Sequence, residues 1–213
     1  MEVKNIVILG ATGAIAQHVI QFLKNKEGVN LTLFARNKSQ LENLIDDGLK
    51  IVAGDVLDDK QLNEVIKGQD IIYANLSGAV DKMATKIIEA MIQNNVQRLI
   101  FVTALGIYNE IPGEFGKWNN KMIGSELVRY RKAADIIESS KINYTIIRPS
   151  WLTNKDEIEY ETTQKGESFL GTEIARKAVA KYIATIIEHP EKDSNSSVGI
   201  NKPGVYGNKP NFY

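Results

Sequence analysis

Short apolar runs and amphipathic helical segments alternate along the chain. Strand-like apolar runs occupy residues 6–9, 31–34, 51–53, 71–74, 99–103 and 144–147, with a further candidate at 198–201. Between these runs, apolar residues recur at spacings of three and four, as Ile15, Val19, Phe22 and Leu23 do in the first helical segment. Buried strands separated by helices are typical of a parallel sheet covered on both faces. The pattern predicts an α/β fold: a doubly wound (Rossmann-type), mostly parallel sheet in a single domain.

The second half of the chain predicts fewer regular elements. We expect a long loop at 109–123 and helices at 125–139 and 172–188. The acidic stretch 156–161 is expected to be an exposed strand or loop. Segments 105–125 and 150–172 are expected to form small elements on the substrate side of the single domain, residues 1–213. The tail at 202–213 is rich in Gly, Pro and Asn, and either docks through Phe212 and Tyr213 or stays disordered.

The first strand runs directly into a glycine-containing turn and then a helix. The candidate phosphate-binding residues of this turn are Gly10, Ala11, Thr12, Gly13, Ala14 and Ile15. Closely spaced glycines let a backbone approach a pyrophosphate, and the helix that follows offers unpaired N–H groups to the anion. The pattern is G-x-x-G-x-x-A, and the small Ala16 in its last position permits close packing of helix on strand. The turn predicts a bound dinucleotide.

The residues after the second strand indicate which dinucleotide is bound. In this kind of fold an acidic residue there binds the 2′-hydroxyl of NAD, whereas arginine accommodates the 2′-phosphate of NADP. Here the strand is followed by Arg36, Asn37 and Lys38, with no acidic residue among them. We therefore expect NADP (as NADPH), with NAD as a possible second cofactor, and we place Arg36 and Asn37 in the site. The alternative is that Arg36 is a solvated loop residue.

Two further strand ends are expected at the same crevice, because ligands of open α/β sheets lie outside the carboxyl ends of the strands. The candidates after the third and fourth strands are Asp55, Val56, Ala74, Asn75, Leu76 and Ser77. Asp55 is suited to bind the adenine amino group, although an Asp after a strand is also a common turn former. Pro149 and Ser150 follow the sixth strand and are expected to border the nicotinamide.

Composition narrows the function classes. The chain has 26 basic and 26 acidic residues and no cysteine, so we expect neither nucleic acid nor a membrane surface as a partner. With no thiol and two separate histidines, we expect no metal site. The start of the chain lacks the features of a signal peptide, and no apolar run reaches membrane-spanning length. We therefore expect a cytoplasmic location.

Several motifs together resemble the atypical short-chain dehydrogenase/reductases, in particular the NmrA-like, NAD(P)-binding branch. The matching stretches are Gly10-Ala11-Thr12-Gly13, Ala35-Arg36-Asn37, Gly54-Asp55-Val56, Phe101-Val102-Thr103 and Ile146-Ile147-Arg148-Pro149-Ser150. This resemblance spans nearly the whole chain. It implies an NAD(P) cofactor but not a substrate, because the branch contains reductases of quinones, flavins and other small molecules alongside redox-sensing regulators.

The resemblance also implies a catalytic arrangement that this chain only partly contains. Active relatives use a Tyr-x-x-x-Lys pair on a helix, with a Ser or Thr after the preceding strand. Lys132 matches the lysine, as a candidate ribose ligand, and Thr103 matches the hydroxyl residue, but Val128 stands where the tyrosine belongs. Tyr108, in the expected loop, is a further candidate for a substrate-facing catalytic residue.

The leading hypothesis is an NADP(H)-dependent oxidoreductase that moves hydride between the nicotinamide and a small-molecule acceptor, with a quinone or flavin favoured. The alternative is a noncatalytic NADP(H)-binding sensor, which implies a protein partner. A sugar-nucleotide epimerase or dehydratase is a third interpretation, weakened by the missing Tyr-x-x-x-Lys pair. The sequence leaves the oligomeric state open.

Overall fold

The computed structural model describes residues 3–37, 39–41 and 49–213. The first half of the chain contains β1 (Lys4–Leu9), α1 (Ala14–Leu23), β2 (Val29–Ala35), β3 (Lys50–Ala53), α2 (Asp59–Ile66), β4 (Ile71–Ala74), α3 (Val80–Gln93) and β5 (Arg98–Val102). The second half contains α4 (Gly113–Ser139), β6 (Asn143–Pro149), β7 (Trp151–Thr153), β8 (Glu161–Gln164), β9 (Glu173–Ala175), α5 (Arg176–Glu188) and β10 (Ser196–Asn201). All seven predicted strand runs are strands. The apolar residues Leu41, Leu44 and Ile45, whose spacing also predicts a helix, lie mostly outside the described residues.

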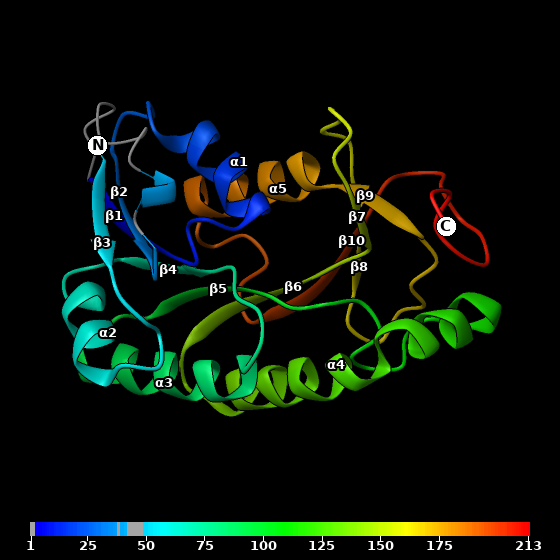
Figure 1. Ribbon diagram of the computed structural model, residues 1–213, viewed down its shortest axis with the longest axis horizontal. Coiled ribbons are helices and arrows are strands. Elements are labelled where there is room, and N and C mark those ends of the chain that lie inside the picture. The colour runs from blue at the N-terminus through cyan, green and yellow to red at the C-terminus, as the bar shows by residue number, and fades with distance from the viewer. Residues whose placement is uncertain (1–2, 38, 42–48) are drawn as a thin grey trace.

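The central sheet has the strand order β3-β2-β1-β4-β5-β6-β10-β8. The strands from β3 to β10 pair in parallel, and β8 pairs antiparallel to β10 at one edge. Helices α1 and α5 cover one face of the sheet, and α2, α3 and α4 cover the other (Figure 1). The predicted doubly wound, mostly parallel sheet is confirmed.

Both faces of the sheet are buried, as the continuous apolar runs require. Along β1, Ile6 and Ile8 belong to the core cluster shared with α1 and α5, whereas Val7 and Leu9 belong to the cluster shared with α2, α3 and α4. None of these four side chains has solvent exposure. Successive side chains of a strand point to opposite faces, so one apolar run supplies residues to two cores.

The prediction of a long loop at 109–123 is wrong from Gly113 onward, because these residues belong to helix α4. The helix begins at Gly113, not near residue 125, and runs unbroken to Ser139. Its added N-terminal turns are held by tertiary packing: Phe115 is buried against Leu105 and Phe169, and Asn119 has no exposed surface. Packing of this kind overrides the poor helix propensity of a segment rich in Gly and Asn.

Three short strands were not predicted. Strands β7 and β9 pair in parallel as a separate two-stranded sheet, and β8 adds a polar edge strand beside β10. The helix expected at 172–188 therefore begins only at Arg176, because Glu173–Ala175 forms β9.

Helix α2 begins with an N-cap of the kind that its sequence favours. The Asp58 side chain accepts a hydrogen bond from the Gln61 N–H.

The tail at 202–213 is docked on the domain, which settles the two alternatives left open by its composition. The Tyr206 hydroxyl donates to the Glu161 carboxylate at 2.9 Å, and the Asn211 N–H donates to Glu173 at 3.0 Å. The ring of Tyr213 lies against Trp118 and Trp151.

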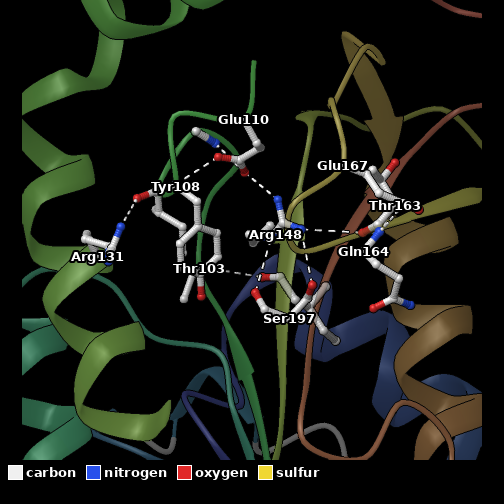
Figure 2. Close-up of polar contacts among 12 residues, drawn as sticks. Thr103, Tyr108, Glu110, Arg131, Arg148, Thr163, Gln164, Glu167 and Ser197 are labelled. Atoms are coloured by element: carbon white, nitrogen blue, oxygen red, sulfur yellow. Dashed lines mark hydrogen bonds and ion pairs between the residues drawn. The ribbon is translucent and has the colours of Figure 1, made fainter. Parts of the chain in front are cut away.

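A buried ion pair fixes the loop that connects β5 to α4 (Figure 2). The Arg148 guanidinium, on β6, has no exposed surface and pairs with the Glu110 carboxylate, which is 4 % exposed. Glu110 also accepts hydrogen bonds from the backbone N–H groups of Gly106 at 3.0 Å and Tyr108 at 2.9 Å. Arg148 in turn donates to Ser197 of β10. The pair therefore ties the loop to strands β6 and β10.

We expect Glu110→Gln to lower the free energy of unfolding by about 3–5 kcal/mol, because it leaves the buried Arg148 charge unpaired. The matched control is Glu114→Gln, which removes an exposed ion pair with Lys117 and should cost less than about 1 kcal/mol. Urea unfolding of the three proteins measures both effects. Equal losses for the two variants would show that the Glu110 pair has no special structural role.

Candidate functional site

A cleft of about 270 Å³ lies at the carboxyl ends of β1, β2, β3 and β4. This is the edge at which α/β sheets bind ligands, where the strand order reverses between β1 and β4. Ten of the predicted cofactor-binding residues line the cleft: Gly10, Thr12, Gly13, Arg36, Asn37, Asp55, Val56, Asn75, Leu76 and Ser77. The structure thus brings together four strand ends that are far apart in sequence.

The turn after β1 lies directly against the end of β4. Gly10 has a φ of +82°, and a Cβ added there would lie 2.3 Å from the carbonyl oxygen of Asn75. A Cβ at Gly13 would lie 2.0 Å from the Asn75 side-chain nitrogen. The turn is closed by a hydrogen bond from the Gly13 N–H to the Gly10 carbonyl at 3.0 Å. Gly10 requires glycine, because its φ is positive and a Cβ would meet a backbone carbonyl, whereas a Cβ at Gly13 would force the Asn75 side chain to move.

The N-terminus of α1 faces this floor without a capping side chain. Its N-cap is Gly13, and the first turn, Ala14 to Ala16, contains no acidic residue. The positive end of the helix dipole and its N–H groups are therefore not neutralised by the helix itself. A phosphate is the kind of group that such a helix start binds.

Polar side chains gather at the end of β2. Arg36 is exposed and lines the cleft together with Asn37 and Gln40. The Asn37 carboxamide accepts hydrogen bonds from the backbone N–H and the hydroxyl of Ser39, at 3.1 and 2.7 Å, which orders the turn beside the guanidinium. Lys38, expected as an auxiliary charge, lies outside the described residues.

Asp55 forms a turn and also lines the cleft. Its carboxylate accepts a hydrogen bond from the Leu57 N–H at 2.9 Å, as a turn former does, while the residue also lines the cleft. The Asp55 N–H donates to the Gln61 side chain at 2.9 Å, so α2 holds this strand end in place. The second carboxylate oxygen is the atom with which Asp55 can meet a ligand.

The other predicted cofactor-binding residues do not line the cleft. Ala11, Ile15 and Ala74 are buried, with 0 %, 4 % and 0 % exposure, and support its walls from behind. Ala14, although exposed, is also outside the lining. The Pro149 carbonyl accepts a hydrogen bond from the Leu105 N–H at 3.3 Å, which joins the ends of β5 and β6.

The hydroxyl groups expected near the nicotinamide donate to acceptors within the protein. The Thr103 hydroxyl donates to the Ile147 carbonyl at 3.1 Å, and the Ser150 hydroxyl donates to the Gly171 carbonyl at 2.7 Å. Tyr108 lies beside the Arg148 and Glu110 pair (Figure 2), and its hydroxyl donates to Glu138 at 2.8 Å. Burial raises the pKa of the Tyr108 phenol well above its ordinary value. All three hydroxyl groups therefore have structural partners.

Lys132 lies on the exposed side of α4, between α3 and α4. There it lines a separate hollow with Asp81, Lys82 and Thr85 of α3. The cleft floor is formed by other elements, so this position gives no support to the expected contact of Lys132 with the nicotinamide ribose. Tyr130, two residues earlier, packs against the core beneath α4.

Five residues that line the cleft were not among the predicted site residues: Phe34, Ala35, Gln40, Gly54 and Met83. Gly54 belongs to a motif that the sequence does indicate, and a Cβ there would lie 2.5 Å from the Phe34 ring. Met83 is on the apolar face of the α3 segment, a signal that places it inward. Gln40 carries no sequence signal, because its position depends on the path of the chain after β2.

A family model described as NAD(P)H-binding matches residues 10–190. The chain belongs to this NAD(P)H-binding family. This agrees with the resemblance of its motifs to the NmrA-like, atypical short-chain dehydrogenase/reductases.

Solved structures and a curated relative support the same family. A Rossmann-fold NAD(P)-binding family protein from Shigella flexneri is 44 % identical with a TM-score of 0.86, and the match covers 100 % of both chains. A short-chain dehydrogenase/reductase from Veillonella parvula, solved in complex with NADP, is 28 % identical with a TM-score of 0.92 over 98 % of this chain and 99 % of that chain. The Bacillus subtilis protein YhfK, described as an uncharacterized sugar epimerase, is 27 % identical over 162 residues, 70 % of this chain and 73 % of YhfK.

Metal-binding clusters and membrane-spanning helices are both absent from the described ranges. No cluster of three or more His, Asp or Glu side chains there is placed to hold a metal ion. None of the helices in this part of the chain has the length and apolarity needed to cross a membrane.

We expect Gly10→Ala to abolish measurable binding of NADP, because the added Cβ meets the Asn75 carbonyl in a left-handed backbone conformation. The control is Gly68→Ala: Gly68 has a φ of +76° but no atom within 4 Å of an added Cβ. Both variants should lose about 1–2 kcal/mol of stability through backbone strain. Gly10→Ala should lose about 1–3 kcal/mol more through the clash with the Asn75 carbonyl, and only this variant should lose binding. Titration calorimetry together with urea unfolding separates the two effects; unchanged NADP binding by Gly10→Ala would contradict the proposed role of the turn.

Proposed function

We propose that this protein is an NADP(H)-dependent oxidoreductase that transfers hydride between the nicotinamide and a small-molecule acceptor, with a quinone or flavin favoured. The observation that carries the proposal is the cleft itself, in which an uncapped helix start and an arginine lie at two neighbouring strand ends. The family match and the NADP complex of the Veillonella parvula protein support the choice of cofactor.

Each part of the cleft has an assigned role in this proposal. The turn from Gly10 to Ile15 binds the pyrophosphate, and Arg36 with Asn37 binds the 2′-phosphate of the adenosine ribose. A guanidinium suits this task because it donates two parallel N–H groups to a phosphate. Asp55 and Val56 border the adenine. The loop from Asn75 to Ser77 follows the pyrophosphate toward β5 and β6.

The preference for quinone or flavin acceptors follows from the hydroxyl groups near the nicotinamide end. Reduction of a simple ketone needs an acid in the protein that delivers a proton to the oxygen as hydride arrives. Thr103, Ser150 and Tyr108 each donate their hydroxyl hydrogen to an internal acceptor. No tyrosine of the chain is followed four residues later by a lysine. Quinones and flavins can take their proton from water, so they depend less on such an acid.

When bound, NADPH supplies one hydride, which carries two electrons and one proton, and becomes NADP⁺. A second proton from water completes the dihydro form of the acceptor. The residues of this chain hold the cofactor at its phosphates and adenosine, and they place its other half along the ends of β5 and β6. Segments 105–125 and 150–172 border that end and are proposed to contact the acceptor.

Arg36→Ala tests the cofactor assignment. Loss of charge-assisted hydrogen bonds to the 2′-phosphate, worth about 1.5–3 kcal/mol, should weaken NADP binding about tenfold or more and leave NAD binding nearly unchanged. The control is Arg129→Ala, which removes an exposed arginine of α4 that pairs with Glu126. Calorimetric titration with both dinucleotides gives the ratio of affinities. A ratio that does not change in Arg36→Ala removes Arg36 from the proposed site.

The reaction is tested by incubating the protein with NADPH and a panel of quinones, flavins and saturated ketones, and following the absorbance of the reduced nicotinamide. We expect oxidation of NADPH with quinones or flavins and little with saturated ketones. Oxidation of NADPH by none of the acceptors, combined with different affinities for NADP⁺ and NADPH, would favour the sensor hypothesis, because only a difference in affinity can shift a conformational equilibrium.

A further inference from the structure

An aromatic cluster lies at the end of the molecule where the tail docks. It contains Trp118 from α4, Trp151 from the start of β7 and Tyr213 from the tail, and we call these three residues the aromatic triad. The ring centroids are 4.7 Å apart for Trp118 and Trp151, 5.1 Å for Trp118 and Tyr213, and 5.2 Å for Trp151 and Tyr213. In Figure 1 the tail lies beside the N-terminal turns of α4.

The position of the aromatic triad matches the acceptor end of the proposed site. Trp151 follows Ser150 directly at the carboxyl end of β6, which pairs with β5. Arg36, the proposed adenosine ligand, lies at the end of β2, on the opposite side of the β1 turn. A dinucleotide gripped at its pyrophosphate by that turn directs its nicotinamide half toward β5 and β6. The triad therefore lies on the side from which an acceptor approaches.

The two tryptophans are rigidly supported from below. The Trp151 indole N–H donates to the Asn119 carboxamide oxygen at 2.9 Å, and Asn119 has no exposed surface. Phe115, Leu105 and Phe169 form the buried base on which Trp118 and Trp151 pack. Both indoles are half-buried. Each ring is therefore held by the protein on one side and partly exposed to solvent on the other.

Tyr213 is held much less firmly. Its side chain is 51 % exposed, and its backbone N–H donates one hydrogen bond, to the Pro210 carbonyl at 3.2 Å. The last anchor of the tail to the domain before it is the hydrogen bond from the Asn211 N–H to the buried Glu173. Rotation of the chain after Asn211 can therefore move Tyr213 away while the rest of the tail stays docked.

The distances within the aromatic triad leave no room for a further ring between its members. A ring inserted between two others requires centroids about 7 Å apart, twice the contact distance of carbon atoms. The observed separations are all near 5 Å. A planar ligand can therefore reach the parts of the two indoles that Tyr213 contacts only by taking the place of the Tyr213 ring.

The planes of Trp118 and Trp151 are inclined to each other by 57°. We propose that the two indoles form an angled platform, on which a planar aromatic acceptor stacks against one ring and meets the other with its edge, and that Tyr213 occupies this platform until the acceptor displaces it. This inference rests on the proposed function, since it assigns residues to the acceptor end of the same site. Tyr213 acts as an internal competitor, because its ring makes edge contacts with both indoles in the free protein. The platform selects for flat, conjugated acceptors, because only these can replace the ring packing that Tyr213 provides.

The test uses the fact that Trp118 and Trp151 are the only two tryptophans of the chain. Tryptophan fluorescence, excited at a wavelength that tyrosine does not absorb, therefore reports on the platform. FMN and menadione are titrated into wild type, Tyr213→Ala, Trp118→Leu and Phe212→Ala, with cyclohexanone as a non-planar carbonyl control. Phe212→Ala is the matched control, because Phe212 is also half exposed and contacts Tyr213 but forms no ring pair with either tryptophan. Thermal unfolding verifies that each variant is folded.

We expect saturable quenching by FMN or menadione, and none by cyclohexanone. Tyr213→Ala should bind about fivefold or more tightly, because the Tyr213 ring no longer competes with the ligand for the two indoles. Trp118→Leu should bind more weakly, and Phe212→Ala should behave like wild type. Unchanged or weaker binding by Tyr213→Ala overturns the inference, as does binding that is insensitive to Trp118→Leu or the absence of saturable quenching in every variant.

Oxidation of NADPH and binding of NADP are measured on the same samples, which keeps the two proposals separable. Fluorescence reads the stacking platform without any hydride transfer. Quenching with the expected variant pattern but no NADPH oxidation means that the proposed reaction fails while the stacking platform exists. NADPH oxidation with unaltered kinetics in Tyr213→Ala and Trp118→Leu means that the reaction stands and the platform does not.

Discussion

The backbone contact between the β1 turn and the end of β4 is the constraint on which the rest of the site depends. Gly10 and Gly13 approach Asn75 so closely that any side chain at either position would collide with it. This approach brings the start of α1 to the point where the strand order reverses, and it leaves the adjoining strand ends open as a cleft. Arg36 is placed to contact a ligand only because the β1 turn forms the floor of the cleft beside it.

The region proposed to bind the acceptor is organised by charge and by ring packing. The buried Arg148 and Glu110 pair fixes the loop after β5 from inside the protein, and this loop in turn contributes Leu105 to the base under the two tryptophans. A buried ion pair of this kind contributes little net stability, but it becomes costly when one partner is removed. Its value here is that it holds one loop geometry, which a purely apolar contact specifies less strictly.

The hydroxyl groups show what a sequence motif leaves open about the surroundings of its residues. Thr103 and Tyr108 have the chemistry of catalytic residues, and the sequence places them after the strand where such residues are expected. In the structure each donates a hydrogen bond to an acceptor inside the protein. Lys132 similarly has the right residue type and faces α3 instead of the cleft. Residue type and spacing cannot show which partner satisfies a donor, because the partners come from distant parts of the chain.

The sequence by itself determined the doubly wound sheet, the positions of its main strands along the chain and the glycine turn, because continuous apolar runs and closely spaced glycines are local patterns with few structural solutions. It also indicated ten of the residues that line the cleft, since these follow directly on strand ends. Only the tertiary structure decided the long N-terminal extension of α4, the small sheet of β7 and β9, and the docking of the tail. These elements are short or poor in intrinsic propensity, and they form because Phe115, Asn119, Trp151 and Tyr213, which are distant in sequence, pack against one another or a shared base.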